Sequence, residues 1–180
     1  MKKPLLKKIF NRIFHQMARS LPGATNLRPF LHRLRGVKIQ GNIFIGDDVY
    51  LENEYPECVE IQDGALIGLR STIIAHTRGP GKIIIGKNAV LAVGCTIVCA
   101  AGQQLTIGEG SVISAGSVVA NNIPPYTLCA GPRVKAIAAI TVPLAGQTSY
   151  HDFIRGLRPI KMPDRGTGRS KEDFQGQTGR

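Results

Sequence analysis

Tryptophan is absent from the 180-residue chain, and aromatic residues make up only 6% of it. Large rings normally supply much of the buried apolar area of a globular core. Without them, the core has to come mainly from Ile, Val, Leu and Ala, which stack well in a narrow interior. Glycine, by contrast, is abundant at 21 residues, as expected for a chain that turns every few positions.

Metal-binding patterns are also missing. The four cysteines include no CxxC pair, and no histidine lies at metal-ligand spacing from any of them; they are Cys58, Cys95, Cys99 and Cys129. We therefore expect no metal site. We interpret all four cysteines as free structural thiols, which is the usual state of cysteine in a reducing compartment.

Acidic residues are absent from the first 38 positions, although these positions hold ten lysines and arginines and so carry most of the net charge of +11. Between residues 5 and 21, apolar side chains recur at three- and four-residue steps, and Pro22-Gly23 follows. This spacing predicts a basic amphipathic helix that ends at the Pro-Gly pair. The basic residues match no nucleic-acid-binding motif, so nucleic acid is not an expected partner.

Long apolar runs are lacking as well. The apolar stretches near the N-terminus are too short and too charged for a transmembrane helix, and they do not form the continuous core of a signal peptide. We therefore expect a cytoplasmic location. Two hypotheses for the helix stay open, and they do not exclude each other. Either it covers the open end of the fold, or residues 2–21 lie on the anionic inner face of a membrane.

An aliphatic residue returns every six positions through the middle of the chain. It does so at Ile39, Ile45 and Leu51, then at Ile61, Ile67 and Ile73, then at Ile85, Leu91 and Ile97, and finally at Ile107, Ile113 and Val119. A period of six fits neither an α-helix nor a simple alternating strand. It is typical of a solenoid in which each hexad forms one side of a triangular coil, with the aliphatic side chain pointing inward.

This pattern resembles that of the hexapeptide-repeat acyltransferases, in particular the sugar O-acetyltransferase type. The resemblance covers about half the chain and implies an all-β fold, a left-handed parallel β-helix, preceded by the N-terminal amphipathic α-helix. We divide the chain accordingly into a basic helical arm over residues 1–35, the β-helix domain over residues 36–142 and a C-terminal extension over residues 143–180. The extension ends in a segment rich in Gly, Arg, Ser and Gln and is expected to be mostly flexible.

Three irregular blocks interrupt the repeat, at residues 52–60, 76–82 and 100–104. Insertions in solenoids collect at functional surfaces. The second block contains His76, the only histidine in the repeat region. In the family that this chain resembles, a histidine in such a stretch acts as a general base. The chemistry suits imidazole, because its pKa allows it to remove a proton from a hydroxyl at neutral pH.

A base of this kind needs a partner that orients its ring. One coil before His76 the chain reaches about position 54, so Asn53 or Glu54 is expected beneath the imidazole, with Glu52 and Glu57 as weaker candidates. The predicted catalytic residues are therefore His76, Asn53 and Glu54. The alternative is an exposed turn histidine beside loop residues that only face solvent.

A second likeness lies near the end of the repeat. The hexads at residues 107–119 lead into Ile123-Pro124-Pro125 and then into Ala130-Gly131-Pro132. This order is similar to the segment along which acetyl-CoA lies in the family. The resemblance implies backbone contacts to the pantetheine and a basic residue at the nucleotide phosphates. It assigns cofactor binding to Ala115, Gly116, Ala120, Asn121 and Lys135.

The function that the resemblance implies is direct acetyl transfer from acetyl-CoA to a hydroxyl of a sugar or saccharide precursor in cell-surface polysaccharide biosynthesis. The basic arm would suit an acceptor that is lipid-linked. The resemblance also implies a homotrimer with active sites between neighbouring chains. The alternative is a catalytically silent β-helix scaffold that its basic arm docks to a membrane or a partner, and such a scaffold would not bind acetyl-CoA. A zinc enzyme of the gamma carbonic anhydrase type needs three histidines from the coils, whereas only His76 is present.

Overall fold

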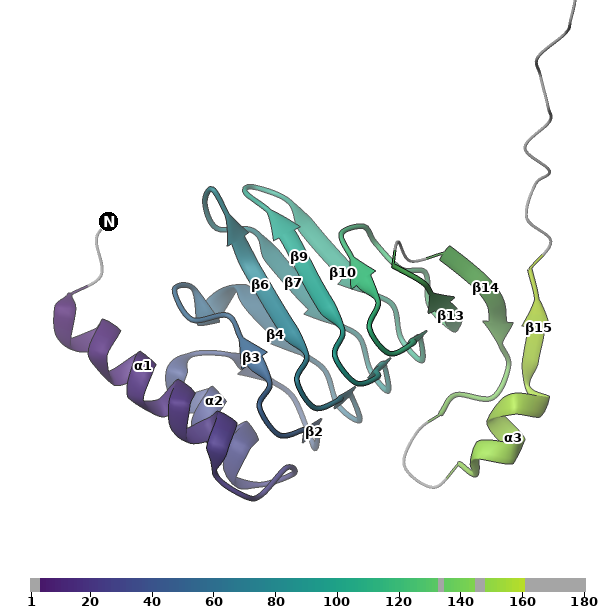
Figure 1. The fold of residues 1–180 in the computed structure, drawn as a ribbon, viewed down its shortest axis with the longest axis horizontal. Helices are drawn as coiled ribbons and strands as arrows, with labels where there is room; N and C mark the ends of the chain where they lie inside the picture. The colour runs from purple at the N-terminus through teal and green to yellow at the C-terminus, as the bar shows by residue number, and fades with distance from the viewer. Residues whose placement is uncertain (1–3, 133–134, 145–147, 161–180) are drawn as a thin grey trace, which may run out of the picture.

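The computed structural model describes residues 4–132, 135–144 and 148–160. Two helices lead into a stack of short parallel strands that form three sheets (Figure 1). The first sheet contains β1 (Lys38–Ile39), β4 (Val59–Ile61), β7 (Lys82–Ile85) and β10 (Gln104–Ile107). The second begins with β2 (Phe44–Ile45), β5 (Leu66–Ile67), β8 (Val90–Leu91) and β11 (Val112–Ile113). The third contains β3 (Tyr50–Leu51), β6 (Thr72–Thr77), β9 (Thr96–Ala100) and β12 (Val118–Val119).

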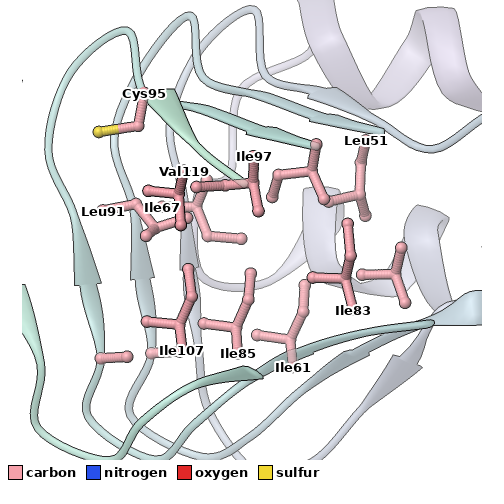
Figure 2. Close-up of a cluster of buried hydrophobic side chains, with 14 of the residues drawn as sticks. Leu51, Ile61, Ile67, Ile83, Ile85, Leu91, Cys95, Ile97, Ile107 and Val119 are labelled. Carbon is pink, nitrogen blue, oxygen red and sulfur yellow. The ribbon is translucent and has the colours of Figure 1, made fainter. Parts of the chain in front are cut away.

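The aliphatic residues of the six-residue period form the core of the prism. Each sheet contributes one inward column, and consecutive members of a column are paired in register, as Ile67 is with Leu91. The members are fully or almost fully buried (Figure 2), except Ile39, which is partly buried and packs against the others. Each buried aliphatic side chain contributes about 1.5–3 kcal/mol relative to an exposed one. The prediction of an all-β parallel β-helix is confirmed.

The turns of the solenoid are longer than three bare hexads. Along the second sheet, the steps from Ile45 to Ile67, to Leu91 and to Ile113 span 22, 24 and 22 residues. The extra residues are the three irregular blocks of the sequence. Each block leaves a strand of the third sheet and returns to a strand of the first, so all three lie at the same corner of the prism. The structure therefore stacks the three blocks on one another.

A second corner, between the second and third sheets, is turned by a column of residues in the left-handed backbone conformation. They are Asp48, Arg70, Gly94 and Gly116, with φ between 54° and 69°. Two members of this column have side chains, so the corner accepts a Cβ although the conformation favours glycine. A Cβ added at Gly94 or Gly116 would meet no heavy atom within 4 Å.

The N-terminal arm forms two helices, α1 (Leu5–Ser20) and α2 (Leu27–Arg35), of which only the first was predicted. They cover the end of the prism at which β1, β2 and β3 lie (Figure 1). The face that α1 turns inward holds His15 and Ala18, which are buried. Its large apolar side chains point outward instead, and Leu6 is 81% exposed. The helix therefore caps the fold, yet leaves its apolar face uncovered.

Arginines of the arm hold the cap in place by donating hydrogen bonds to carbonyls of the first coil. Arg33 bonds the carbonyl of Ile39 at 3.4 Å, Arg28 that of Ile45 at 3.0 Å, and Arg35 that of Leu51 at 3.1 Å. These three acceptors belong to β1, β2 and β3, the edge strands of the three sheets. Unpaired edge carbonyls need partners when they are covered. One arginine per sheet meets this need.

At the opposite end, antiparallel strands continue the second sheet. β11 pairs with β13 (Thr127–Ala130), which pairs with β14 (Lys135–Ile140), and β14 pairs with β15 (Leu157–Pro159). Helix α3 (Tyr150–Arg155) precedes β15 and buries Phe153 against this sheet. Part of the C-terminal extension is thus folded onto the solenoid. The Gly-, Arg-, Ser- and Gln-rich end of the extension, which was predicted to be flexible, lies outside the described residues.

Candidate active site

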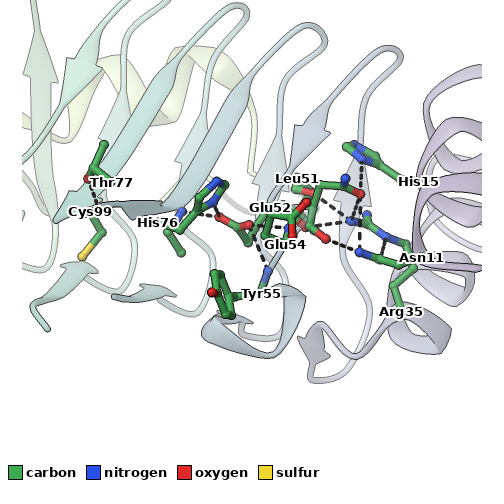
Figure 3. A network of polar contacts seen from close by, with 12 residues as sticks. Asn11, His15, Arg35, Leu51, Glu52, Glu54, Tyr55, His76, Thr77 and Cys99 are labelled. Carbon is green, nitrogen blue, oxygen red and sulfur yellow. Dashed lines mark hydrogen bonds and ion pairs between the residues drawn. The ribbon is translucent and has the colours of Figure 1, made fainter. Parts of the chain in front are cut away.

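The central group of the site is the carboxylate of Glu52, which is completely buried. It follows β3 directly, where the chain leaves the third sheet. One carboxylate oxygen accepts hydrogen bonds from the backbone N–H groups of Glu54 and Tyr55, at 2.8 and 3.1 Å. The other oxygen lies 2.7 Å from the backbone nitrogen of Ala75 and 2.7 Å from Nδ1 of His76 (Figure 3). Four donors thus fix the position of this carboxylate.

His76 lies on β6, within the irregularity that interrupts the pairing of β6 with β9 between Ile74 and Thr77. Bulges of this kind commonly re-aim a side chain beside an active site. The His76 side chain is 31% exposed, whereas that of Glu52 is inaccessible. Because the carboxylate is an acceptor, Nδ1 carries the proton and Nε2 keeps its lone pair. The pair therefore presents a partly exposed imidazole whose orientation is fixed by the buried carboxylate.

Arg35 holds the loop that carries Glu52. Its guanidinium donates to the backbone carbonyls of Leu51 and Glu52, at 3.1 and 2.7 Å, and to Oδ1 of Asn11 in α1 at 2.7 Å. Burial lowers the pKa of Arg35 to about 10, so it stays charged at neutral pH. The cap and the Glu52–His76 pair are consequently parts of one continuous hydrogen-bond network (Figure 3).

The residues assigned to the cofactor lie near the other end of the solenoid. Ala120 and Asn121 line a groove of about 440 Å³ together with Pro124, Pro132 and other residues of this end. Ala115 and Gly116 are exposed at the corner before β12 and do not line this groove. Lys135 begins β14, where its backbone pairs with Ala130. Of the five assigned residues, the structure brings Ala120 and Asn121 together at this groove.

Comparison with known proteins gives a consistent result, although no family model matches the chain. The chain is 29% identical over 143 residues to YvoF of Bacillus subtilis, a protein that carries the name of an acetyltransferase, and the match covers 74% of this chain and 78% of YvoF. A similarly named protein of Staphylococcus aureus, SACOL2570, is 37% identical over 75 residues, which cover 42% of this chain but only 36% of that protein.

Solved structures extend the likeness to the fold. A galactoside acetyltransferase in complex with coenzyme A superimposes with a TM-score of 0.55 and 23% identity, covering 74% of this chain and 80% of that one. A hexapeptide-repeat-containing acetyltransferase from Vibrio cholerae gives a TM-score of 0.50 with 19% identity, covering 74% and 90%. The chain has the fold of the hexapeptide-repeat acetyltransferases. The resemblance seen in the sequence is confirmed by both the relatives and the fold.

Within this hexapeptide-repeat fold, the partner of His76 differs from the sequence prediction. Coil register would place residue 54 beneath residue 76, but pairing of β3 with β6 ends at Leu51 and Ile73. The next residue, Glu52, contacts the imidazole instead. Asn53 turns toward the cap, where its Oδ1 lies 3.1 Å from Nδ1 of His15. Glu54 contributes its backbone N–H to Glu52. Glu52 was predicted only as a weaker candidate; an acidic residue directly after the last inward aliphatic position is the signal that would have favoured it.

Other chemistry is not supported by the described residues. No group of three or more His, Cys, Asp or Glu side chains among them could hold a metal ion. None of the four cysteines forms a disulfide bond, and burial raises the pKa of Cys95 and of Cys129, which lowers their reactivity. Among the described helices, none combines the length and apolarity needed to span a bilayer.

Two histidines of the cap are buried without charge. Desolvation, together with the positive charge of Arg35, lowers the pKa of His15 to about 4 and that of His32 well below its usual value. The Nε2 atoms of both rings have no hydrogen-bond partner in the described part of the chain. Protonating either ring would therefore place a charge beside Arg35 in a dry environment.

This arrangement predicts acid sensitivity of the cap. A histidine with a depressed folded pKa binds fewer protons in the folded state, so stability is complete above the unfolded pKa of about 6.5 and falls as the pH drops toward 4. The melting temperature of the wild type should fall through this window, and that of His15→Gln should fall less steeply. His151→Gln, which changes an exposed histidine, is the control. Equal pH dependence of all three proteins would contradict the prediction.

Proposed function

We propose that this protein is an acetyl-CoA-dependent O-acetyltransferase whose acceptor is a hydroxyl of a saccharide, with a role in the biosynthesis of cell-surface polysaccharide. The Glu52–His76 pair is the observation that carries this proposal. A buried carboxylate with four donors orients a half-exposed imidazole in a coil irregularity. The fold and the acetyltransferase relatives support acetyl as the transferred group.

The proposed chemistry is a single direct transfer. Acetyl-CoA supplies an acetyl group already activated as a thioester. His76 Nε2 takes the proton of the acceptor hydroxyl while the hydroxyl oxygen forms a bond to the carbonyl carbon of the acetyl group. The bond between this carbon and the sulfur of coenzyme A then breaks. The imidazolium then returns the proton to the departing sulfur, so that the ester and free coenzyme A result. Glu52 accepts the hydrogen bond of Nδ1–H and so keeps Nε2 available for the proton. Its negative charge also stabilises the imidazolium that exists until the proton reaches the sulfur.

Several features near the C-terminal end of the solenoid suit the coenzyme. Gly116 is exposed and has open space where a Cβ would point, so a ligand can approach its backbone closely. Ala120 and Asn121 border the groove of about 440 Å³. Ala115 and Lys135 complete the proposed contacts, the lysine at the nucleotide phosphates. We further propose a homotrimer in which His76 of one chain faces the coenzyme groove of its neighbour; sedimentation or light scattering measures this state.

Replacing the base provides the first test. His76→Ala should lower kcat by roughly 10²–10⁴-fold in an acetyl-CoA turnover assay with a panel of sugars and amino sugars, because proton removal loses its acceptor. Glu52→Gln should also lower kcat without changing acetyl-CoA affinity. His151→Ala is the matched control. A His76→Ala protein that retains near-full turnover would exclude this base, and a wild type that binds no acetyl-CoA would favour the scaffold function instead.

The coenzyme site can be tested with two glycines of the same corner column. Gly116→Asn adds a side chain that tolerates the left-handed conformation, so the fold should persist while the pantetheine path narrows. The Michaelis constant for acetyl-CoA should rise at least tenfold, a change of about 1.4 kcal/mol. Gly94→Asn, at the equivalent position one coil earlier with φ 68°, should leave it unchanged. Similar constants for the two variants would move the coenzyme away from Gly116.

We also propose that the outward face of α1 contacts an anionic membrane surface. Leu6, Ile13 and Met17 are 81%, 54% and 38% exposed on this face, and Lys8 and Arg12 are exposed as well. A helix of this kind lies in the interface with its apolar face buried and its basic residues near lipid headgroups. Such a contact would bring the enzyme to acceptors that are attached to the membrane.

Vesicle sedimentation measures this contact. Binding to phosphatidylglycerol vesicles should weaken as salt rises, because the attraction is screened within about 8 Å at physiological ionic strength. Binding to phosphatidylcholine vesicles should be weak. Met17→Asn should reduce binding, whereas Ile154→Asn, an exposed apolar residue on α3, should not. Salt-independent binding, or an equal effect of both variants, would count against contact through α1.

A further inference from the structure

A groove of about 970 Å³ lies between α1, the end of α2 and the loop after β3. Its apolar lining consists of Leu5, Leu6, Ile9, Phe10, Ile13, Leu34 and Pro56. Pockets of this size and apolarity usually bury most of the surface of one bound ligand. A saccharide alone would gain little from such a lining, because its surface is covered with hydroxyl groups.

The groove also has polar lining residues. They are Asn11, Arg35, Asn53 and Glu54, and they form its polar part. Asn53 and Glu54 follow Glu52 directly in the chain, and Glu52 contacts His76. In Figure 3, Glu54 lies between the Glu52–His76 pair and the cluster of Asn11 and Arg35. The polar part of the groove therefore includes the loop that carries Glu52, the residue in contact with the proposed base.

Basic residues complete the lining. Lys7, Lys8 and Arg12 also line the groove, and the first 38 residues contain no acidic side chain. An anionic group attached to an apolar chain matches this combination. A second copy of the same surface does not, because two basic rims would repel each other. A flat bilayer matches the convex outer face of α1 better than the groove itself.

We propose that the groove binds the apolar chain of a lipid-linked saccharide acceptor, with its anionic linkage at Lys7, Lys8 or Arg12 and its saccharide toward Asn53 and Glu54. The apolar chain of the acceptor would hold the molecule in the groove while the hydroxyl to be acetylated reaches His76. This inference rests on the proposed function, because it names the class of acceptor for the same site. It assigns a binding role to the cap beyond closing the end of the prism.

Binding of alkyl phosphates tests the groove without requiring turnover. Hexyl, octyl and decyl phosphate are titrated by calorimetry below their micelle concentrations, with methyl phosphate as the headgroup control. Each added methylene should strengthen binding by roughly two- to fourfold, because it is transferred from water into the apolar lining. Saturation at one molecule per chain is expected, and methyl phosphate should bind weakly.

Leu5, Leu6, Ile9, Phe10 and Ile13 belong both to the groove and to the outward face of α1, so variants outside this shared set separate the two contacts. Leu34→Asn changes an exposed lining residue and should weaken decyl phosphate binding at least tenfold. Met17→Asn changes an exposed residue of the same cap outside the groove and should leave that affinity unchanged while reducing vesicle binding. Lys8→Gln should weaken decyl phosphate more than decanol. Circular dichroism confirms that each variant keeps its fold.

Three results would overturn the inference. The first is the absence of saturable decyl phosphate binding to the wild type. The second is an equal loss in Leu34→Asn and Met17→Asn, which would indicate a diffuse contact of the outer face with lipid. The third is binding that does not depend on chain length. None of these depends on acetyl transfer, so turnover of a soluble sugar acceptor in the same protein would show that the proposed function stands while this inference fails.

Discussion

A stack of coils leaves the edge strands of its sheets without partners, and this constraint governs the first half of the structure. Arg33, Arg28 and Arg35 each donate a hydrogen bond to the edge strand of a different sheet. Guanidinium groups suit this task because several donors project from one planar group. The cap is therefore attached mainly through polar contacts, and charges that looked like a free basic surface in the sequence are partly used inside the protein.

The same attachment explains why α1 is oriented with its apolar face outward. Arg35 needs Asn11 beside it, and Asn53 needs His15, so the polar side of α1 faces the prism. The apolar side chains of α1 are left for another surface to cover. Because Arg35 also binds the carbonyls of Leu51 and Glu52, the helix that faces outward is joined to the carboxylate behind His76. In our proposals, a few side chains thus link the membrane contact of α1, the binding of the acceptor in the groove and the removal of the acceptor proton by His76.

The sequence predicted the repeat well because each inward position depends on a single local rule. Every aliphatic residue of the period is in the core or packs against it, from Ile39 to Val119. It predicted the site less well. His76 was identified as the unusual residue of an irregular block, but coil arithmetic missed Glu52, since the loop leaves the register at Leu51. The orientation of α1 was also not predicted. An amphipathic pattern does not show that the polar face of the helix packs on the prism, where it contacts the buried Arg35.

The stacking of three irregular blocks at one corner has a consequence for how such a protein can diversify. The turns differ in length, at 22, 24 and 22 residues, yet the inward columns stay in register on all three sheets. Residues can therefore be inserted or deleted at this corner without displacing a core side chain. Beyond the hydrogen bonds that hold Glu52, the loops at this corner can vary in length, so acceptor preference can change through small insertions and deletions while the inward columns keep their register.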